Sequence, residues 1–428
     1  MGFKLDSSWA PRFFVIWTGQ ALSMLGSALV QFALVWWLTS STGSATVLSV
    51  ATLIALLPQI LVSPFVGPLV DRLDRRRIMI LADLGVAAAT AVLMLIFLYG
   101  RVQLWHIYVA MAARSLGQAF HSPAMISSTS LLVPDEHLTR ISGLNQTLHG
   151  LINIIAPPVG AILISTLPMQ GVLAIDLVTA LLAVSPLFFI SIPSPSADKG
   201  GSRKGSALSS YVADLKAGLN YVFAWKGLFA LILLAMMLNF LLAPAGSLMP
   251  IFVTKVFGRG AIDLAAVETA IGAGVILGGL ILSAWGGFKR KILTSLVGVS
   301  GMGLGVLIVG ITPADLFALT IAASFITGVT QVFANGSLSA ILMSTVRRDM
   351  QGRVFSLLSA GAAAMMPLSL MIAGPLSDRF GIRTWYIGGG IVCIAVSLLS
   401  IGLKPLMEIE SNVAAATHPV PAAVDKLG

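Results

Sequence analysis

The chain has 428 residues, of which 57% are hydrophobic and only 10% are charged. Its mean hydropathy of +0.95 excludes an ordinary soluble globular protein. The formal net charge of +9 would suit a nucleic-acid partner, unless the placement of the basic residues has another cause.

Twelve apolar stretches follow one another along the chain. A helix needs about 20 apolar residues to cross a bilayer, and these stretches lack the alternation of a barrel strand. In lipid, helices are then the remaining way to satisfy the backbone. We therefore predict an all-α membrane protein with spans at 13–38, 45–70, 77–99, 104–132, 139–166, 169–192, 227–254, 262–286, 291–312, 315–345, 352–376 and 383–404.

The first stretch is too long for a signal peptide, and Lys4, Asp6 and Arg12 precede it. Basic residues also orient the chain. If both termini are cytoplasmic, most of the 26 Lys and Arg residues face the cytoplasm, as the positive-inside rule requires. The positive charge then reflects topology, with a weak attraction to anionic lipid, and we expect no nucleic-acid partner.

Segment 67–77 concentrates charge between two apolar stretches. Gly67 and Pro68 close one run, Asp71 follows, and four arginines come before Ile78. A similar pattern returns at 374–381, and 286–291 holds a reduced copy that keeps only the basic residues. Segment 116–122 likewise matches 329–335, so that Gln118 corresponds to Gln331. A three-helix unit used four times, with successive units inverted, would produce both kinds of repeat.

Segment 67–77 resembles the loop between helices 2 and 3 of major facilitator superfamily transporters, although Asp74 stands where that family usually has Gly. Gln20, segment 23–27, segment 42–45, segment 82–84 and segment 114–123 look especially like its macrolide-efflux branch. The resemblance implies two pseudo-symmetric six-helix bundles, each of two inverted three-helix repeats. We expect bundles at 1–192 and 226–405, a cytoplasmic linker with an interfacial helix at 193–225, and a disordered tail at 406–428.

The resemblance also implies a cytoplasmic gate. In the family the residue equivalent to Asp71 faces the N-terminus of helix 11, here beside Arg353, and a carboxylate there would meet the positive end of the helix dipole. The plain alternative is that the arginines only hold the loop inside. The expected gate and motif residues are Gly67, Asp71, Arg72, Arg75, Asp83, Arg353 and Asp378.

Arg114 lies near the middle of the fourth span, where a charge is costly and is usually functional or paired. The family resemblance implies a role in proton coupling, and structural pairing is the alternative. Its partner must be acidic, which leaves Asp83, Asp176 and Glu268 as candidates. We expect proton coupling to involve Arg114, Asp176 and Glu268, with Glu268 as the first choice for the coupling carboxylate.

Polar side chains in the spans suit a substrate cavity, although interhelical hydrogen bonds would also explain them. The candidates are Gln20, Gln31, Gln118, His121, Asn145, Asn239, Gln331 and Asn335, and His121 also fits a satisfied core histidine. In the fifth span, Pro157, Pro158 and Gly160 resemble the family's antiporter motif, with alanines for two of its glycines.

The single cysteine, Cys393, leaves no intrachain disulfide and no Cys-based metal site. No P-loop pattern or catalytic set appears, so we predict neither an enzyme nor a cofactor or metal. The expected function is proton-coupled export of bulky amphipathic compounds, such as macrolides, by a monomer in the bacterial inner membrane. A siderophore or lysophospholipid exporter is the second possibility, and a non-transporting membrane sensor or scaffold is a remote third.

Overall fold

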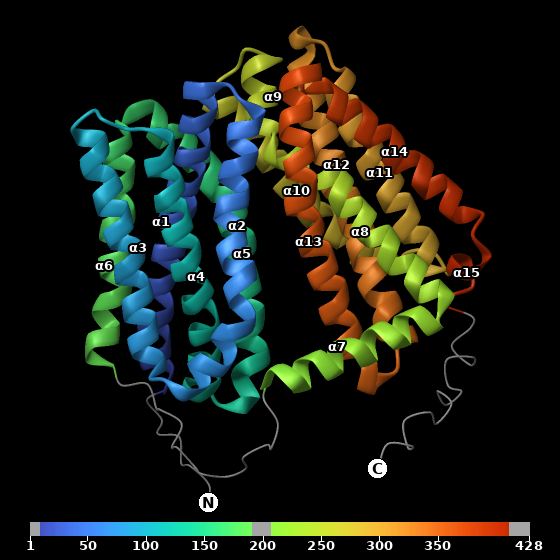
Figure 1. Cartoon of the computed structure of the whole chain (residues 1–428), viewed down its shortest axis with the longest axis horizontal. Coiled ribbons are helices and arrows are strands. Elements are labelled where there is room, and N and C mark those ends of the chain that lie inside the picture. Colours follow the sequence, from blue (N-terminus) through green and yellow to red (C-terminus); the bar gives the residue numbers. More distant parts are fainter. Residues whose placement is uncertain (1–8, 191–206, 411–428) are drawn as a thin grey trace, which may run out of the picture. The chain divides into compact units, whose positions relative to one another are not determined.

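The computed structural model describes residues 9–190 and 207–410. Within these ranges, the side chains of 63–64, 67–68, 71–72 and 207–215 are not described. The described chain folds into helices with no strand among them (Figure 1). In order these are α1 (Trp9–Thr42), α2 (Ala45–Arg72), α3 (Arg75–Leu98), α4 (Leu104–Leu132), α5 (Asp135–Thr166), α6 (Met169–Phe189), α7 (Ala207–Ala224), α8 (Lys226–Ser247), α9 (Met249–Lys255), α10 (Ala261–Trp285), α11 (Lys291–Ile311), a 3-10 turn (Ala314–Leu316), α12 (Phe317–Thr345), α13 (Arg348–Phe380), α14 (Arg383–Ile401) and α15 (Lys404–Met407).

Eleven segments of the described chain are long and apolar enough to cross a membrane. The one predicted span missing from these eleven is 104–132, which is α4. This helix is long enough, but it also carries Arg114, Gln118 and His121. These polar residues lower its hydropathy, and they belong to the site described below. The prediction of an all-helical multi-pass membrane protein is confirmed.

Several helices extend beyond their apolar windows. α1 starts at Trp9 and α13 starts at Arg348, four residues before each predicted span. A helical backbone continues into the polar boundary of a membrane, where hydropathy no longer reports it. The predicted seventh span, 227–254, is broken at Leu248 into α8 and the short α9.

Contacts divide the chain into two compact units. The first comprises 1–203 and 247–269, and the second comprises 204–246 and 270–428. In the first unit, α1 packs on α5 and α6, α4 packs on α2 and α3, and α3 packs on α6. Gly160 lets α5 approach α1 closely, since a Cβ there would lie 2.9 Å from the Phe32 ring.

The second unit is organised around α11, which packs on both α12 and α14. Glycines bring α10 and α12 together in the same unit. A Cβ on Gly278 would lie 2.6 Å from the carbonyl oxygen of Val329, and a Cβ on Gly328 would overlap the backbone at Ile271. Small residues at such positions let helices approach closely, which is how helices associate in lipid.

Two peripheral segments also belong to the second unit. α7 runs crosswise to α8 and contacts α13 (Figure 1). The predicted tail at 406–428 begins inside a described segment. Glu410 accepts hydrogen bonds from the backbone N–H groups of Lys291 and Ile292, at 3.1 and 3.3 Å, and so caps the start of α11. The rest of that tail, 411–428, lies outside the described residues.

Asp74 has a structural role in place of the usual glycine. Its backbone is extended, with φ −66° and ψ 108°, and its side chain accepts hydrogen bonds from the backbone N–H groups of Arg76 and Arg77. This is an N-cap for α3. No left-handed residue is needed at that turn, so the absence of Gly does not disturb the connection between α2 and α3.

Candidate transport site

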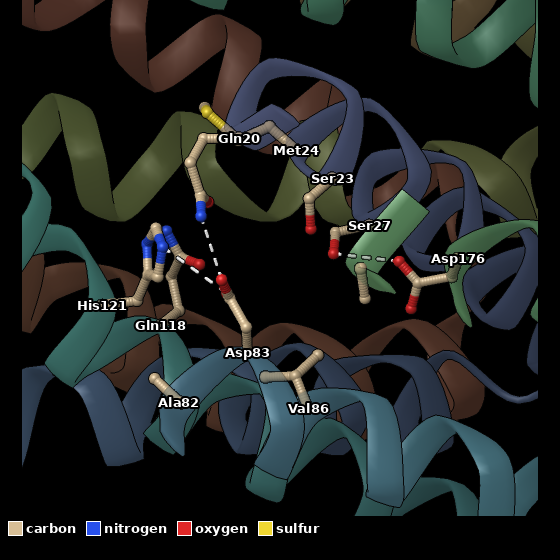
Figure 2. Close-up of a pocket in the computed structure, with 12 residues that line it drawn as sticks. Gln20, Ser23, Met24, Ser27, Ala82, Asp83, Val86, Gln118, His121 and Asp176 are labelled. Carbon is tan, nitrogen blue, oxygen red and sulfur yellow. Dashed lines mark hydrogen bonds and ion pairs between the residues drawn. The ribbon is translucent and has the colours of Figure 1, made fainter. Parts of the chain in front are cut away.

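A small cavity lies among α1, α3, α4 and α6 of the first unit (Figure 2). Its volume is about 40 Å³. Helical spacing accounts for the set of residues on each helix, because side chains three, four or seven positions apart share a face. The lining residues are Gln20, Ser23, Met24, Ser27, Ala82, Asp83, Val86, Gly117, Gln118, His121, Asp176 and Ala180.

Asp176 is the centre of a dense hydrogen-bond network. Its side chain is 2% exposed and forms an ion pair with Arg114. The hydroxyls of Ser27 and Thr90 each donate to the Asp176 carboxylate at 3.1 Å. Arg114 also donates to Thr90 Oγ1 at 2.6 Å and to the backbone carbonyl oxygen of Ser27 at 3.3 Å. Four helices thus contribute to one buried ion pair whose donors and acceptors are mutually satisfied.

Asp83 forms a second and sparser cluster. Gln20 donates its amide to Asp83 Oδ2 at 3.0 Å. His121 Nε2 lies 3.4 Å from Asp83 Oδ1. As whole residues, Gln20, Asp83 and His121 are each at most 9% exposed. Figure 2 shows the His121 imidazole and the Gln20 amide both pointing towards the Asp83 carboxylate. The structure thus buries Asp83 among these groups, and the gate role expected for it stays a prediction.

The similarity to known proteins covers most of the chain. The model of the Major Facilitator Superfamily matches residues 16–369. The chain belongs to the Major Facilitator Superfamily. Members of this superfamily are transporters and not enzymes, in agreement with the absence of an enzymatic signature in the sequence.

Individual superfamily members resemble this transporter to different degrees. Macrolide efflux protein A of Streptococcus pyogenes is 34% identical over 91% of this chain and 96% of its own. The multidrug efflux pump Tap of Mycolicibacterium fortuitum is 24% identical over 90% of this chain and 94% of its own. A solved bacterial homologue of the iron transporter ferroportin, in an inward-facing state, aligns with a TM-score of 0.69 at 14% identity. The alignment covers 92% of this chain and 99% of that chain, and at 14% identity it supports the fold alone.

The charged motif of the superfamily lies where α2 ends and α3 begins. The side chains of Gly67, Asp71 and Arg72 lie outside the described set, so the expected gate contact of Asp71 stays a prediction. Arg75 opens α3, Arg353 is half-buried in the second turn of α13, and Asp378 is exposed near the end of α13. Asp349, at the start of α13, pairs with Arg347 at 2.7 Å.

The predicted cavity amides are distributed over both units. Gln20 and Gln118 line the cavity, and Asn145 accepts a 2.7 Å hydrogen bond from Trp17 between α5 and α1. Asn239 donates to the carbonyl oxygen of Ala235 in its own helix at 2.9 Å. The remaining three do not line this cavity, and they are Gln31 on α1 and Gln331 and Asn335 on α12.

Glu268 lies half-buried on α10. In the described part of the chain, no residue forms an ion pair with it.

Pro157 and Pro158 lie within the continuous helix α5, and Gly160 forms the close contact with α1. Sequence reasoning did not select Thr90 as a site residue, because an isolated threonine in an apolar span gives no signal until the helix facing it is known.

Proposed function

We propose that this transporter exports bulky amphipathic compounds, macrolide-like drugs among them, in exchange for protons. The observation that carries the cargo assignment is the similarity to macrolide efflux protein A along nearly the whole of both chains. The similarity to a multidrug efflux pump supports export and a broad substrate range.

Proton coupling is supported by charge buried in the membrane helices. The Arg114–Asp176 pair and the carboxylate of Glu268 lie in spans where ionised groups are costly and usually serve ion or proton pathways. A carboxylate whose surroundings change between access states can bind a proton in one state and release it in the other. We assign Arg114, Asp176 and Glu268 to that exchange.

The membrane arrangement belongs to the same proposal. The distribution of basic residues supports a bacterial inner-membrane protein with both termini in the cytoplasm. Cargo then moves outward from the cytoplasm or the inner leaflet through a monomer. We assign the cytoplasmic gate to the α2–α3 motif with Asp71, on the resemblance of that segment to the motif of the superfamily.

The chemistry of the cargo discriminates between the alternatives. A siderophore is anionic and would need a surplus of basic side chains, whereas the guanidinium of Arg114 is already paired with Asp176, and Glu268 adds a further carboxylate to the spans. Neutral or cationic cargo therefore suits this transporter better than a siderophore.

Transport in proteoliposomes tests the function. Vesicles with an acidic lumen should accumulate a radiolabelled macrolide through inside-out transporters, and a protonophore should abolish the accumulation. Vesicles without a pH gradient are the control. A siderophore and a lysophospholipid are assayed in parallel. Accumulation of either one, without gradient-driven flux of any macrolide, would overturn the cargo assignment.

A further inference from the structure

The two carboxylates of the cavity have different partners. Asp176 pairs with the guanidinium of Arg114 and accepts two hydroxyl donors. Asp83 receives one neutral amide, from Gln20, and faces an imidazole. The charge of Asp176 is therefore compensated within the described structure, while that of Asp83 is compensated only when His121 is protonated.

The charged groups around Asp83 do not balance when His121 is neutral. Asp83 faces His121 from α4 and Asp176 from α6, with Arg114 of α4 bound to Asp176, and α1 contributes only the Gln20 amide and serine hydroxyls. Two carboxylates and one guanidinium leave one uncompensated negative charge when the imidazole is neutral. An uncompensated charge buried in a membrane bundle is strongly unfavourable. Binding of one proton makes the cluster neutral.

We propose that Asp83 and His121 together bind the exchangeable proton in the first unit, an inference that rests on the proposed proton antiport. The proton forms an N–H bond at His121 Nε2 or an O–H bond at Asp83 Oδ1, two atoms 3.4 Å apart. His121 Nε2 has no hydrogen-bond partner among the described residues, so it is available to receive the proton. In each cycle the pair takes one proton from water on the outer side and gives it to water on the cytoplasmic side.

The size of the cavity supports a proton pathway. A buried water needs a cavity volume of roughly 10–15 Å³. The cavity of about 40 Å³ therefore has room for about three waters. It is far too small for a macrolide. Ser23 and Ser27 project from α1 between Asp83 and Asp176 (Figure 2), and they provide the hydroxyls that such waters need. In this proposal Gln118 and His121 serve the proton and not the cargo.

Gln20 is a positioning residue for this pair. Its amide holds Asp83 Oδ2, which directs Oδ1 towards the imidazole. Arg114 acts at a distance by neutralising Asp176, so that a single proton, and not two, completes the charge balance of the cavity.

Variants at Asp83 and His121 test the assignment in proteoliposomes. For Asp83→Asn we expect at least a tenfold loss of macrolide accumulation driven by a pH gradient, with macrolide–macrolide exchange within about twofold of the wild type. A pH-sensitive dye trapped in the lumen should report that macrolide-dependent proton efflux is lost as well. His121→Gln should likewise reduce both the macrolide accumulation driven by the pH gradient and the macrolide-dependent proton efflux. It should leave macrolide–macrolide exchange unchanged within about twofold. Ser128→Ala, also on α4, is the control, because among the described residues the Ser128 hydroxyl donates only to Ala124 O of its own helix and to Met79 Sδ, and Ser128 does not line the cavity.

Each outcome has one meaning. Loss of proton-driven transport with retained exchange supports the assignment. Wild-type proton efflux in Asp83→Asn overturns it, and so does equal loss of exchange and proton-driven transport in both variants, since that indicates a structural role. Failure of the wild-type transporter to respond to the gradient overturns the proposed antiport instead, and the inference with it.

Discussion

Arg76 and Arg383 make the same contact in different units of the transporter. Arg76 donates to the carbonyl oxygens of Leu187 and Phe188 at the C-terminal end of α6. Arg383 donates to those of Gly310 and Thr312 at the C-terminal end of α11, at 3.3 and 2.8 Å. The last carbonyls of a helix lack intrahelical partners and carry partial negative charge. Each arginine fork therefore joins the start of one helix to the end of another.

These two arginines are equivalent in the sequence repeat. When Gly67 and Asp71 are aligned with Gly374 and Asp378, Arg76 falls on Arg383. The repeat seen in the sequence at 374–381 therefore extends two residues further, to Arg383. At Gly381 the backbone has φ +88°, which favours glycine, whereas the equivalent Asp74 caps α3 with its side chain. The two loops thus begin their helices differently and keep the same arginine.

Replacement of either arginine by Ala should destabilise its own unit. We expect a loss of about 1–3 kcal/mol in the free energy of unfolding, because two charge-assisted hydrogen bonds are removed. Lys should recover only part, since an ammonium lacks the planar fork. Equilibrium unfolding in detergent measures both effects. The double variant Arg76→Ala/Arg383→Ala should show additive losses, because the two sites share no partner. A large coupling energy between them would contradict independent contacts.

The Arg114–Asp176 pair predicts a stability rescue. Arg114→Gln leaves the Asp176 charge buried without its cation and should cost about 3–5 kcal/mol. Arg114→Gln/Asp176→Asn removes both charges and should recover most of that loss. Thermal unfolding of the purified single and double variants measures the cycle. A double variant as unstable as Arg114→Gln would indicate that hydrogen bonds to Arg114, and not the ion pair, dominate.

Sequence reasoning reached the components of this site but not their pairing. Because the spans contain few acidic residues, the candidate partners of Arg114 were only Asp83, Asp176 and Glu268. Selecting Asp176 requires knowledge of which faces of α3, α4 and α6 meet, and such apolar spans contain little of that information. The fold was more accessible, because span length and the internal repeat are properties of the chain itself.

Glu410 predicts a stabilising role for a segment that the sequence assigned to a disordered tail. Its carboxylate caps the first two N–H groups of α11, where a negative charge also meets the positive end of the helix dipole. Glu410→Ala should lower the stability of the second unit by about 1–2 kcal/mol. Glu410→Gln should lose less, because it keeps one acceptor. Hydrogen exchange at the start of α11 should increase in the Ala variant, and unchanged protection there would contradict the cap.

Neighbouring glycines on α10 provide a matched pair for the packing of α10 on α12. A Cβ on Gly278 would lie 2.6 Å from the backbone oxygen of Val329, whereas a Cβ on Gly279 has no atom within 4 Å. Gly278→Ala should therefore cost about 1–3 kcal/mol through overpacking. Gly279→Ala should be neutral or slightly stabilising, because Ala is the better helix former. Unfolding in detergent measures the stability of both variants. Equal losses of unfolding free energy would contradict the idea that the close approach of α10 to α12 requires Gly278.

Glu268 and Asp263 allow the coupling role of α10 to be tested on one helix. Glu268→Gln removes a titratable group with little change in shape, so it should abolish uphill macrolide transport while macrolide binding stays within about twofold. Asp263→Asn is the control, since Asp263 lies in the first turn of α10 and pairs with Arg259 at 3.1 Å. That variant should transport like the wild type. Proteoliposome flux and equilibrium binding provide the two readouts. Full proton-driven accumulation by Glu268→Gln would remove Glu268 from the coupling mechanism and leave Asp83 with His121 as the proton site.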